Sequence, residues 1–307
     1  MADLKLFVTL WPSFPHFLEF ADDERIAGIR LNSAMMSQTE LEQELAIASA
    51  QADVPLWFDV KGRQLRIAEV LPNEDHLDIR LNHPIRVPTP SDVLFKAGAD
   101  GAQLHHLEED GLRLVFVGGP HYKVREGESL HVRDPALEVL GPIFTAQELA
   151  KIERVKKAGI KRWFLSYVEE QRDVDLFREL IGTDAQIMLK IESRRGLEYV
   201  AKDFEKSDGI TLVAARGDLY VEVDRPHDVL KATKLVLEKD PQACVASRLL
   251  LSCINGPVPE CVDFSELAWL YDIGYRNMML CDELCLKGNL LARAMNVFEA
   301  FRREYAN

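Results

Sequence analysis

The chain has 307 residues, of which 47% are hydrophobic and 28% are charged, so it can bury a large core in one barrel or in two ordinary domains. Its formal net charge of -13 argues against nucleic acid or an anionic membrane as the main partner, because both are bound by basic surfaces. No apolar run approaches the roughly 20 residues that span a bilayer. The five cysteines are odd in number, which suits reduced thiols, and we therefore expect a cytoplasmic protein.

Short β-rich apolar runs alternate with amphipathic stretches of helical period, a rhythm typical of a parallel sheet. In chain order, the predicted strands cover 4–10, 25–32, 54–60, 160–166, 185–192, 208–215, 243–247 and 276–281. The predicted helices between and after them cover 14–19, 38–51, 145–159, 173–182, 196–204, 226–240, 263–274 and 289–304. Eight strands, each followed by a helix, predict an α/β fold with a closed (β/α)8 TIM barrel. A doubly wound open sheet is the rival, but no glycine-rich phosphate fingerprint follows the first strand.

The rhythm breaks after the third strand. From 68 to 140 the chain carries Pro, Gly and His among short alternating segments, and a stretch of this length is seldom a bare loop. We predict that 68–140 form a small β-rich lid subdomain, inserted into a barrel built from 1–67 and 141–307. The helix that follows the insertion carries a capping-box pattern, with Thr145 as the N-cap and Glu148 three residues later.

A lysine and a glutamate stand one residue apart in "MLKIESRRG" (188–196). If the run is a strand, Lys190 and Glu192 point to the same side, since side chains alternate along a strand. Taken alone, such a pair is most simply two solvated charges at the end of a strand. In a TIM barrel, however, the strand ends meet at one rim, where the chemistry takes place. The predicted strand ends bring to this rim Arg30, Asn32, Asp59, Lys61, Ser166, Lys190, Glu192, Asp218 and Ser247.

Two carboxylates of this set come from neighbouring βα units. Glu192 and Asp218 have no His or Cys nearby in the sequence, and such a pair suits a hard divalent cation, Mg²⁺ or Mn²⁺. In "LVAARGDLYVEV", Asp218 follows Ala215, Arg216 and Gly217 in a predicted strand-to-turn segment. Its backbone N–H groups could bind an anion. The alternative interpretation is a charged surface turn.

Five motifs, in the same order along the chain, resemble the pyruvate kinase family. "VTLWPS" and "IRLNSAM" are similar to the family's C-T-I-G-P-[AS] and A-R-L-N-F-S-H, and "FDVKGRQLRI" is similar to L-D-T-K-G-P-E-I-R. "LKIESRRGL" resembles K-I-E-N-x-x-G, and "DGITLVAARGDLYVEV" resembles D-G-I-M-V-A-R-G-D-L-G-V-E-I. The break after the third strand falls where the family inserts its lid. "CVASRLLLSCI" and "MMLCDELCLKG" match later motifs of the family more weakly.

The resemblance implies roles in catalysis and substrate binding. Lys190 would neutralise the charge of the phosphoryl group in transfer, Arg30 would grip the phosphate, and Ser247 would take part in proton delivery to the enolate. Ser166 would line the substrate pocket. The backbone of Ala215, Arg216, Gly217 and Asp218 would bind the substrate carboxylate.

The resemblance also implies ions and a nucleotide. Glu192 and Asp218 would hold the divalent metal, and Arg66 would reach a phosphate of ADP or ATP. Asn32 and Asp59 would be two ligands of a potassium ion. We also expect a homo-oligomer.

Departures from the family's motifs weaken the expectation that the protein binds a nucleotide and a potassium ion. Ser33, Ala34 and Met35 stand in place of F-S-H, which removes a potassium-ligand serine and a histidine near the nucleotide. Arg63 replaces the proline of D-T-K-G-P. The insertion is shorter than the usual lid, and we expect the family's C-terminal effector domain to be absent.

Three functions therefore remain open. The leading one is a Mg²⁺-dependent phosphotransferase of pyruvate kinase type, which acts on phosphoenolpyruvate and pyruvate in glycolysis through an enolate. The second is a metal-dependent lyase or aldolase that uses the same enolate-binding half without a nucleotide. The third is a non-catalytic homologue that binds a small carboxylate. Buried charge is costly unless it is paired, so preservation of the charged residues argues against the third.

Overall fold

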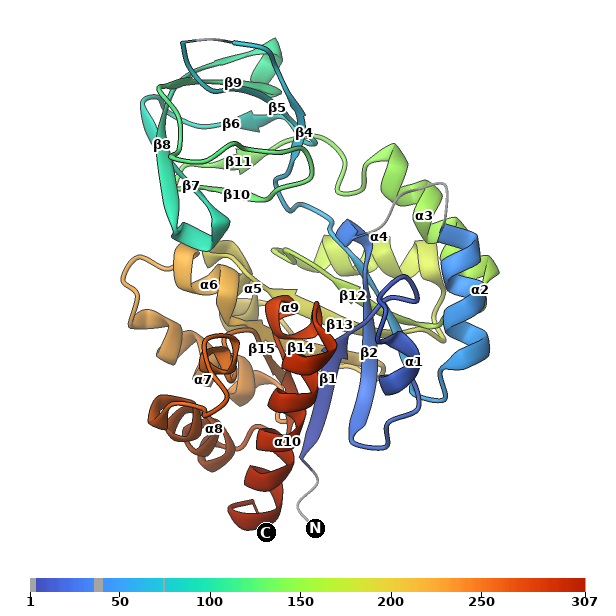
Figure 1. Cartoon of the computed structure of the whole chain (residues 1–307). Coiled ribbons are helices and arrows are strands. Elements are labelled where there is room, and N and C mark those ends of the chain that lie inside the picture. The colour runs from blue at the N-terminus through green and yellow to red at the C-terminus, as the bar shows by residue number, and fades with distance from the viewer. Residues whose placement is uncertain (1–3, 36–40, 74, 307) are drawn as a thin grey trace.

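The computed structural model describes residues 4–35, 41–73 and 75–306, and this part of the chain contains a closed parallel barrel with an insertion above its mouth (Figure 1). The strand order around the barrel is β1-β16-β15-β14-β13-β12-β3-β2, which confirms the predicted (β/α)8 architecture. The eight strands are β1 (Lys5–Thr9), β2 (Ile26–Asn32), β3 (Leu56–Val60), β12 (Arg162–Leu165), β13 (Gln186–Ile191), β14 (Ile210–Ala215), β15 (Cys244–Ala246) and β16 (Asn277–Met279).

Helices follow the strands and form the outer layer of the barrel (Figure 1). They are α1 (Phe17–Phe20), α2 (Leu41–Gln51), α3 (Ala146–Lys157), α4 (Gln171–Ile181), α5 (Arg194–Lys202), α6 (Arg216–Glu222), α7 (Asp228–Lys239), α8 (Cys261–Ile273), α9 (Asp282–Cys285) and α10 (Gly288–Glu304). The first residues of the helix predicted over 38–51 lie outside the described residues. No described helix is long and apolar enough to cross a bilayer.

Two short helices differ from the sequence prediction. The segment predicted as a strand-to-turn connection is the start of α6, because helical backbone from Arg216 onward buries Leu219 and Val221. Asp282 begins α9, a four-residue helix that the sequence pattern did not indicate. Both helices start directly above the ends of barrel strands, so both bring polar residues to the mouth.

Apolar side chains fill the interior of the barrel on the side away from the mouth. Seven of the eight strands contribute to this interior cluster, which consists of Phe7, Trp57, Phe164, Met188, Val213, Cys244, Ala246 and Met279. A larger cluster lies between the strands and the surrounding helices. Because side chains alternate along a strand, the residue two places after each interior residue also points inward, one layer closer to the mouth.

The insertion after β3 is β-rich, as predicted. It contains a six-stranded antiparallel sheet in the order β10-β7-β8-β9-β5-β4 and a two-stranded sheet, β11-β6. The strands are β4 (Ile67–Val70), β5 (Asp78–Leu81), β6 (Ile85–Arg86), β7 (Ser91–Phe95), β8 (Asp100–Glu108), β9 (Arg113–Val117), β10 (Leu130–Val132) and β11 (Glu138–Val139). This sheet has its own hydrophobic cluster, separate from that of the barrel. The split of the chain at 68 and 140 stays a prediction.

The predicted capping box of α3 is present, and it also fastens the end of β3. Thr145 Oγ1 accepts a hydrogen bond from the Glu148 N–H, and Glu148 Oε2 accepts one from the Thr145 N–H at 3.2 Å. The other oxygen, Glu148 Oε1, accepts hydrogen bonds from the N–H groups of Lys61 (2.9 Å) and Gly62 (3.0 Å). One carboxylate therefore satisfies three backbone donors and joins the two ends of the insertion.

We predict that Thr145→Ala lowers the free energy of unfolding by about 1 kcal/mol, because the N-cap acceptor is lost. Thr145→Ser keeps the hydroxyl and is expected to stay close to the wild type. Urea unfolding followed by tryptophan fluorescence measures both variants. Equal stability of the Ala and Ser variants would contradict the role of the cap.

Candidate active site

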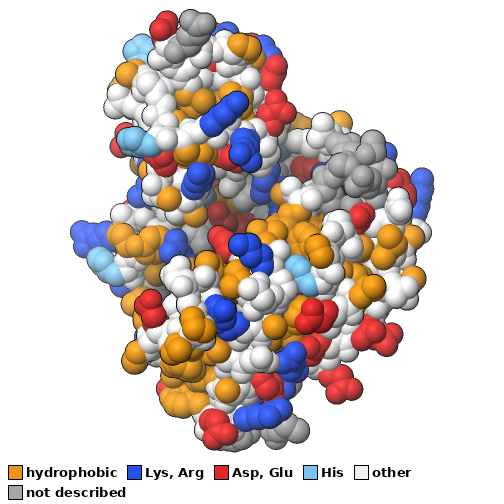
Figure 2. All heavy atoms as spheres, viewed as in Figure 1, with side chains coloured by type: hydrophobic (Ala, Val, Ile, Leu, Met, Phe, Trp, Pro, Cys, Tyr) orange, Lys and Arg blue, Asp and Glu red, His pale blue; other side chains and the backbone are white. Residues whose placement is uncertain are grey.

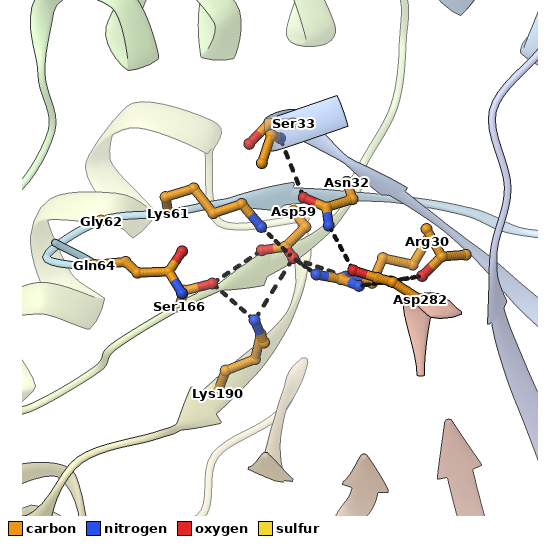
Figure 3. A network of polar contacts seen from close by, with 12 residues as sticks. Arg30, Asn32, Ser33, Asp59, Lys61, Gly62, Gln64, Ser166, Lys190 and Asp282 are labelled. Carbon is orange, nitrogen blue, oxygen red and sulfur yellow. Dashed lines mark hydrogen bonds and ion pairs between the residues drawn. The ribbon is translucent and has the colours of Figure 1, made fainter. Parts of the chain in front are cut away.

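The site begins one layer above the apolar interior of the barrel. Thr9, Arg30, Asp59, Ser166 and Lys190 each stand two residues after an inward-facing position on their strand. The register aligns them, with Thr9 beside Arg30 across β1 and β2. Strand geometry alone therefore gathers two hydroxyls, two cations and a carboxylate at the mouth, and Figure 3 shows the side chains of Arg30, Asp59, Ser166 and Lys190 converging.

Asp59 is the centre of this layer and has no exposed surface. Its Oδ2 accepts hydrogen bonds from Arg30 Nε at 2.7 Å and from Lys61 Nζ at 2.9 Å, and it lies 3.6 Å from Lys190 Nζ. Its Oδ1 accepts a hydrogen bond from Ser166 Oγ at 3.1 Å (Figure 3). Burial by itself would raise the pKa of Asp59, but the positive charges of Lys190, Lys61 and Arg30 outweigh it and hold the pKa well below its usual range. Asp59 is therefore a carboxylate that three cations share.

Lys190 is a buried ammonium between two carboxylates. Its Nζ lies 2.9 Å from Glu192 Oε1 and donates a hydrogen bond to Ser166 Oγ at 2.9 Å. Burial lowers the pKa of Lys190, but Asp59 and Glu192 together raise it above the ordinary value. The predicted pairing of Lys190 with Glu192 on one side of a strand is present, and both side chains are buried rather than solvated.

Glu192 and Asp218 form the acidic side of the mouth. Glu192 is fully buried, and burial together with the nearby charge of Asp218 raises its pKa to about 7. Glu192 Oε2 accepts a hydrogen bond from the Tyr167 N–H at 2.8 Å, whereas Oε1 has no hydrogen-bond partner of acceptable geometry. Asp218 lies in the first turn of α6 and is about one quarter exposed.

This donor set fits a divalent cation. Carboxylate oxygens are the ligands that Mg²⁺ prefers, and it is usually held by one or two of them while its other positions go to water or substrate oxygens. Glu192 Oε1 is a buried oxygen that pairs with the Lys190 ammonium at 2.9 Å without a hydrogen bond of acceptable geometry, so it has coordination left for such a cation. In the described residues no group of three or more His, Cys, Asp or Glu side chains is arranged as a metal cage. The two carboxylates would therefore leave positions open for a ligand.

Asn32 and Asp59 already have partners within the protein. Asn32 Nδ2 donates to Asp282 Oδ2 at 3.0 Å, and Asn32 Oδ1 accepts from the Ala34 N–H at 3.1 Å. A monovalent cation at Asp59 would meet the charges of Arg30, Lys61 and Lys190. This electrostatic environment opposes the potassium site that the resemblance implied.

The sequence prediction missed Asp282, which stands at the first position of α9. Asp282 Oδ1 accepts a hydrogen bond from Arg30 Nη1 at 2.7 Å (Figure 3). It accepts a second one from Thr9 Oγ1 at 2.8 Å. Burial opposes the ionisation of Asp282, but the charge of Arg30 and the hydrogen bond from Thr9 lower its pKa below the usual value. Arg30, predicted to grip a phosphate, is thus held between Asp59 and Asp282. The signal in the sequence was a carboxylate three residues after β16, within a motif already singled out.

The other predicted residues lie close to this cluster but differ in orientation. Ser247 follows β15 with a left-handed backbone (φ 68°) and packs tightly against Gly217, where an added Cβ would lie 3.2 Å from Ser247 Cβ. The Arg216 side chain points away from the mouth, since it donates to Ser247 O (2.7 Å) and to Glu266 Oε1 (2.6 Å). Arg66 donates to Gln64 Oε1 and to Gly127 O, so it contacts the insertion.

Two neighbouring cavities occupy the space between the barrel and the insertion, where Figure 2 shows a hollow bordered by charged side chains. The first, of about 420 Å³, is lined by Arg30, Lys190, Glu192, Asp218, Ser247 and Asp282 among others. The second, of about 560 Å³, lies between the rim and the insertion, where Thr145 and Lys151 contribute to its wall. Lys61 and Arg66 line both.

The lining of the first cavity is basic compared with the rest of the protein. Its cations are Arg30, Lys61, Arg66, Lys96, Lys190 and Arg248, and its carboxylates are Glu192, Asp218, Asp282 and Glu283. The chain as a whole carries a formal charge of -13. The mouth of the barrel is therefore suited to a small anion that the remaining surface would repel.

Comparison of the sequence with those of known proteins identifies the family to which the chain belongs. The family model described as "Pyruvate kinase, barrel domain" matches residues 122–290, more than half of the chain. The pyruvate kinase of Methanocaldococcus jannaschii is 27% identical over 301 residues, which cover 92% of this chain and 65% of that protein. The pyruvate kinase of Thermoplasma acidophilum is 26% identical over 285 residues, which cover 86% and 51%. The chain thus spans about half to two thirds of the length of these two relatives, and it belongs to the pyruvate kinase family.

Proposed function

We propose that the protein is a Mg²⁺-dependent phosphotransferase of pyruvate kinase type, which transfers a phosphoryl group between phosphoenolpyruvate and a nucleoside diphosphate through an enolate. The observation that carries this proposal is the position of Lys190 and Arg30 beside Glu192 and Asp218 at one mouth. Phosphoryl transfer needs little covalent chemistry from the protein, so it depends on positioning and on the neutralisation of charge. Family membership and the names of the two relatives support the same reaction.

The acidic residues of the mouth would bind the metal, and its basic residues would bind the phosphoryl group. Glu192 and Asp218 would hold the divalent cation, which supplies Lewis-acid stabilisation to the enolate oxygen when it is bound. The Lys190 ammonium, kept charged by Asp59 and Glu192, would neutralise the phosphoryl oxygens during transfer. The backbone N–H groups at the start of α6 would bind the substrate carboxylate. The bond from the enol oxygen to phosphorus would break as a bond from phosphorus to the diphosphate oxygen forms, and the enolate carbon would then take up a proton from solvent on the side of Ser247.

The nucleotide would approach through the second cavity. Arg66 and Lys61 line both cavities, so a chain of phosphates could pass from one to the other while it contacts both cations. We do not extend the proposal to a potassium ion, because three cations already surround Asp59. A cytoplasmic location and a homo-oligomeric state stay predictions.

One observation favours a second candidate, a metal-dependent lyase or aldolase that forms the same enolate without a nucleotide. Asp282 neutralises Arg30, the residue that would grip the transferred phosphate. A substrate without a phosphoryl group would not have to compete with Asp282 for this arginine. Exchange of pyruvate methyl protons with solvent in the presence of Mg²⁺ alone, without any phosphotransfer, would favour this candidate.

We predict that the purified protein with Mg²⁺ converts phosphoenolpyruvate and a nucleoside diphosphate to pyruvate and the triphosphate. Lys190→Met is expected to lower kcat by about 10²-fold or more, because a positive charge is lost where charge develops in transfer. Lys202→Met, which removes an exposed lysine of α5, is the control and should not change kcat. A coupled assay for pyruvate measures all three proteins. Absence of turnover across nucleoside diphosphates would refute the proposal.

We also predict that Asp282→Asn tightens the binding of phosphoenolpyruvate by about tenfold, or ~1.4 kcal/mol, because Arg30 loses a competing negative charge. Oxalate, which mimics the enolate but has no phosphoryl group, should bind the variant and the wild type about equally. Calorimetry with both ligands in the presence of Mg²⁺ gives the comparison. Unchanged or weaker binding of phosphoenolpyruvate would show that Asp282 does not compete for Arg30.

A further inference from the structure

A histidine of the insertion lies between two acidic residues of α6. Asp218 and Glu222 are four residues apart in this helix, so their side chains lie on one face. His131, in β10, faces both of them: Nε2 lies 3.4 Å from Asp218 Oδ1, and Nδ1 lies 2.8 Å from Glu222 Oε1. The His131 side chain is only 1% exposed. The ring therefore separates two like charges that would otherwise repel one another.

The same histidine reaches the second carboxylate of the mouth through Tyr167. The Tyr167 hydroxyl lies 3.3 Å from His131 Nδ1, and the Tyr167 N–H donates to Glu192 Oε2 at 2.8 Å. Tyr167 has a left-handed backbone (φ 51°), which is unfavourable for a residue with a large side chain and needs support from its surroundings. His131 thus contacts Asp218 directly and Glu192 through one intermediate residue.

The position of His131 depends on how the insertion docks on the barrel. Two residues after it, Arg133 Nη1 donates to the carbonyl oxygens of Val221 and of Val223, the latter at 3.2 Å, at the end of α6. Figure 1 shows the insertion resting above α6. Because these contacts join β10 to the helix that carries Asp218, movement of the insertion would also remove His131 from the carboxylates.

We propose that His131 is a positioning residue that orients the carboxylates of Asp218 and Glu192 for the divalent cation, so that metal affinity depends on the docked insertion. This role rests on the proposed function, in which the same carboxylates hold the metal. Groups that hydrogen-bond to metal ligands typically change metal affinity by 10- to 100-fold. By linkage, the bound cation would favour the docked position of the insertion by the same factor.

The test is calorimetric titration with Mn²⁺ in the absence of substrate and nucleotide. His131→Ala is expected to weaken Mn²⁺ binding by about 10-fold or more. His131→Gln, whose amide N–H can still donate to one of the two carboxylates, should recover part of the affinity. Glu222→Gln should also weaken binding, because the ring loses its nearer anchor.

The matched control is His121→Ala, which removes a histidine of the same insertion that is 95% exposed and pairs with Asp100. It should bind Mn²⁺ as the wild type does. Circular dichroism spectra and melting temperatures establish that each variant is folded, and the Gln variants keep the test valid if the Ala variant is not.

Two results would overturn the inference, and they differ. Equal or tighter Mn²⁺ binding by folded His131→Ala and His131→Gln, with normal binding by the wild type, would refute the role of His131 alone. If the wild type itself binds no Mn²⁺, the proposed metal site fails and the role of His131 fails with it.

Discussion

The arrangement of this protein depends on one buried carboxylate, that of Asp59. A negative charge without solvent is stable only when cations and hydrogen-bond donors surround it, and here Arg30, Lys61, Lys190 and Ser166 do so. The three cations are buried in turn, and the charge of Asp59 favours the charged form of each of them inside the barrel. Removal of the carboxylate would leave three cations facing one another. The mouth therefore behaves as one electrostatic unit rather than as a set of separate pairs.

The pairing with Asp59 explains how buried cations can gather at the barrel mouth of a chain whose overall charge is strongly negative. Asp59 compensates them from below, while Glu192, Asp218 and Asp282 stand at the sides of the cavity. Asp282 is the most exposed of these three carboxylates, since its side chain is 29% exposed, and it binds Arg30 from the side of the cavity. A ligand phosphate that replaced Asp282 would exchange one anion for another at Arg30. The affinity of the site for a phosphate therefore depends on whether the Arg30 guanidinium binds that phosphate more strongly than it binds the Asp282 carboxylate.

The sequence was sufficient to predict the residues that strand geometry positions. Arg30, Asp59 and Lys190 lie on regular strands and Ser166 directly follows one, so the period of two and the common rim bring them together once the barrel is inferred. Asp282 and His131 could not be predicted in this way. Asp282 reaches the mouth through a four-residue helix without a periodic pattern, and His131 belongs to a sheet whose docking on α6 is a tertiary contact. Local periodicity contains no information on either.

The contacts of the insertion have a further consequence for the site. The insertion has its own hydrophobic cluster, separate from that of the barrel. The hydrogen bonds and ion pairs that join it to the barrel are polar, among them those of His131 and Arg133 with α6 and of His83 with Gly62 O. Polar contacts exchange readily with water and give little net free energy each. Movement of the insertion as a unit would change the surroundings of the carboxylates that it contacts at the mouth.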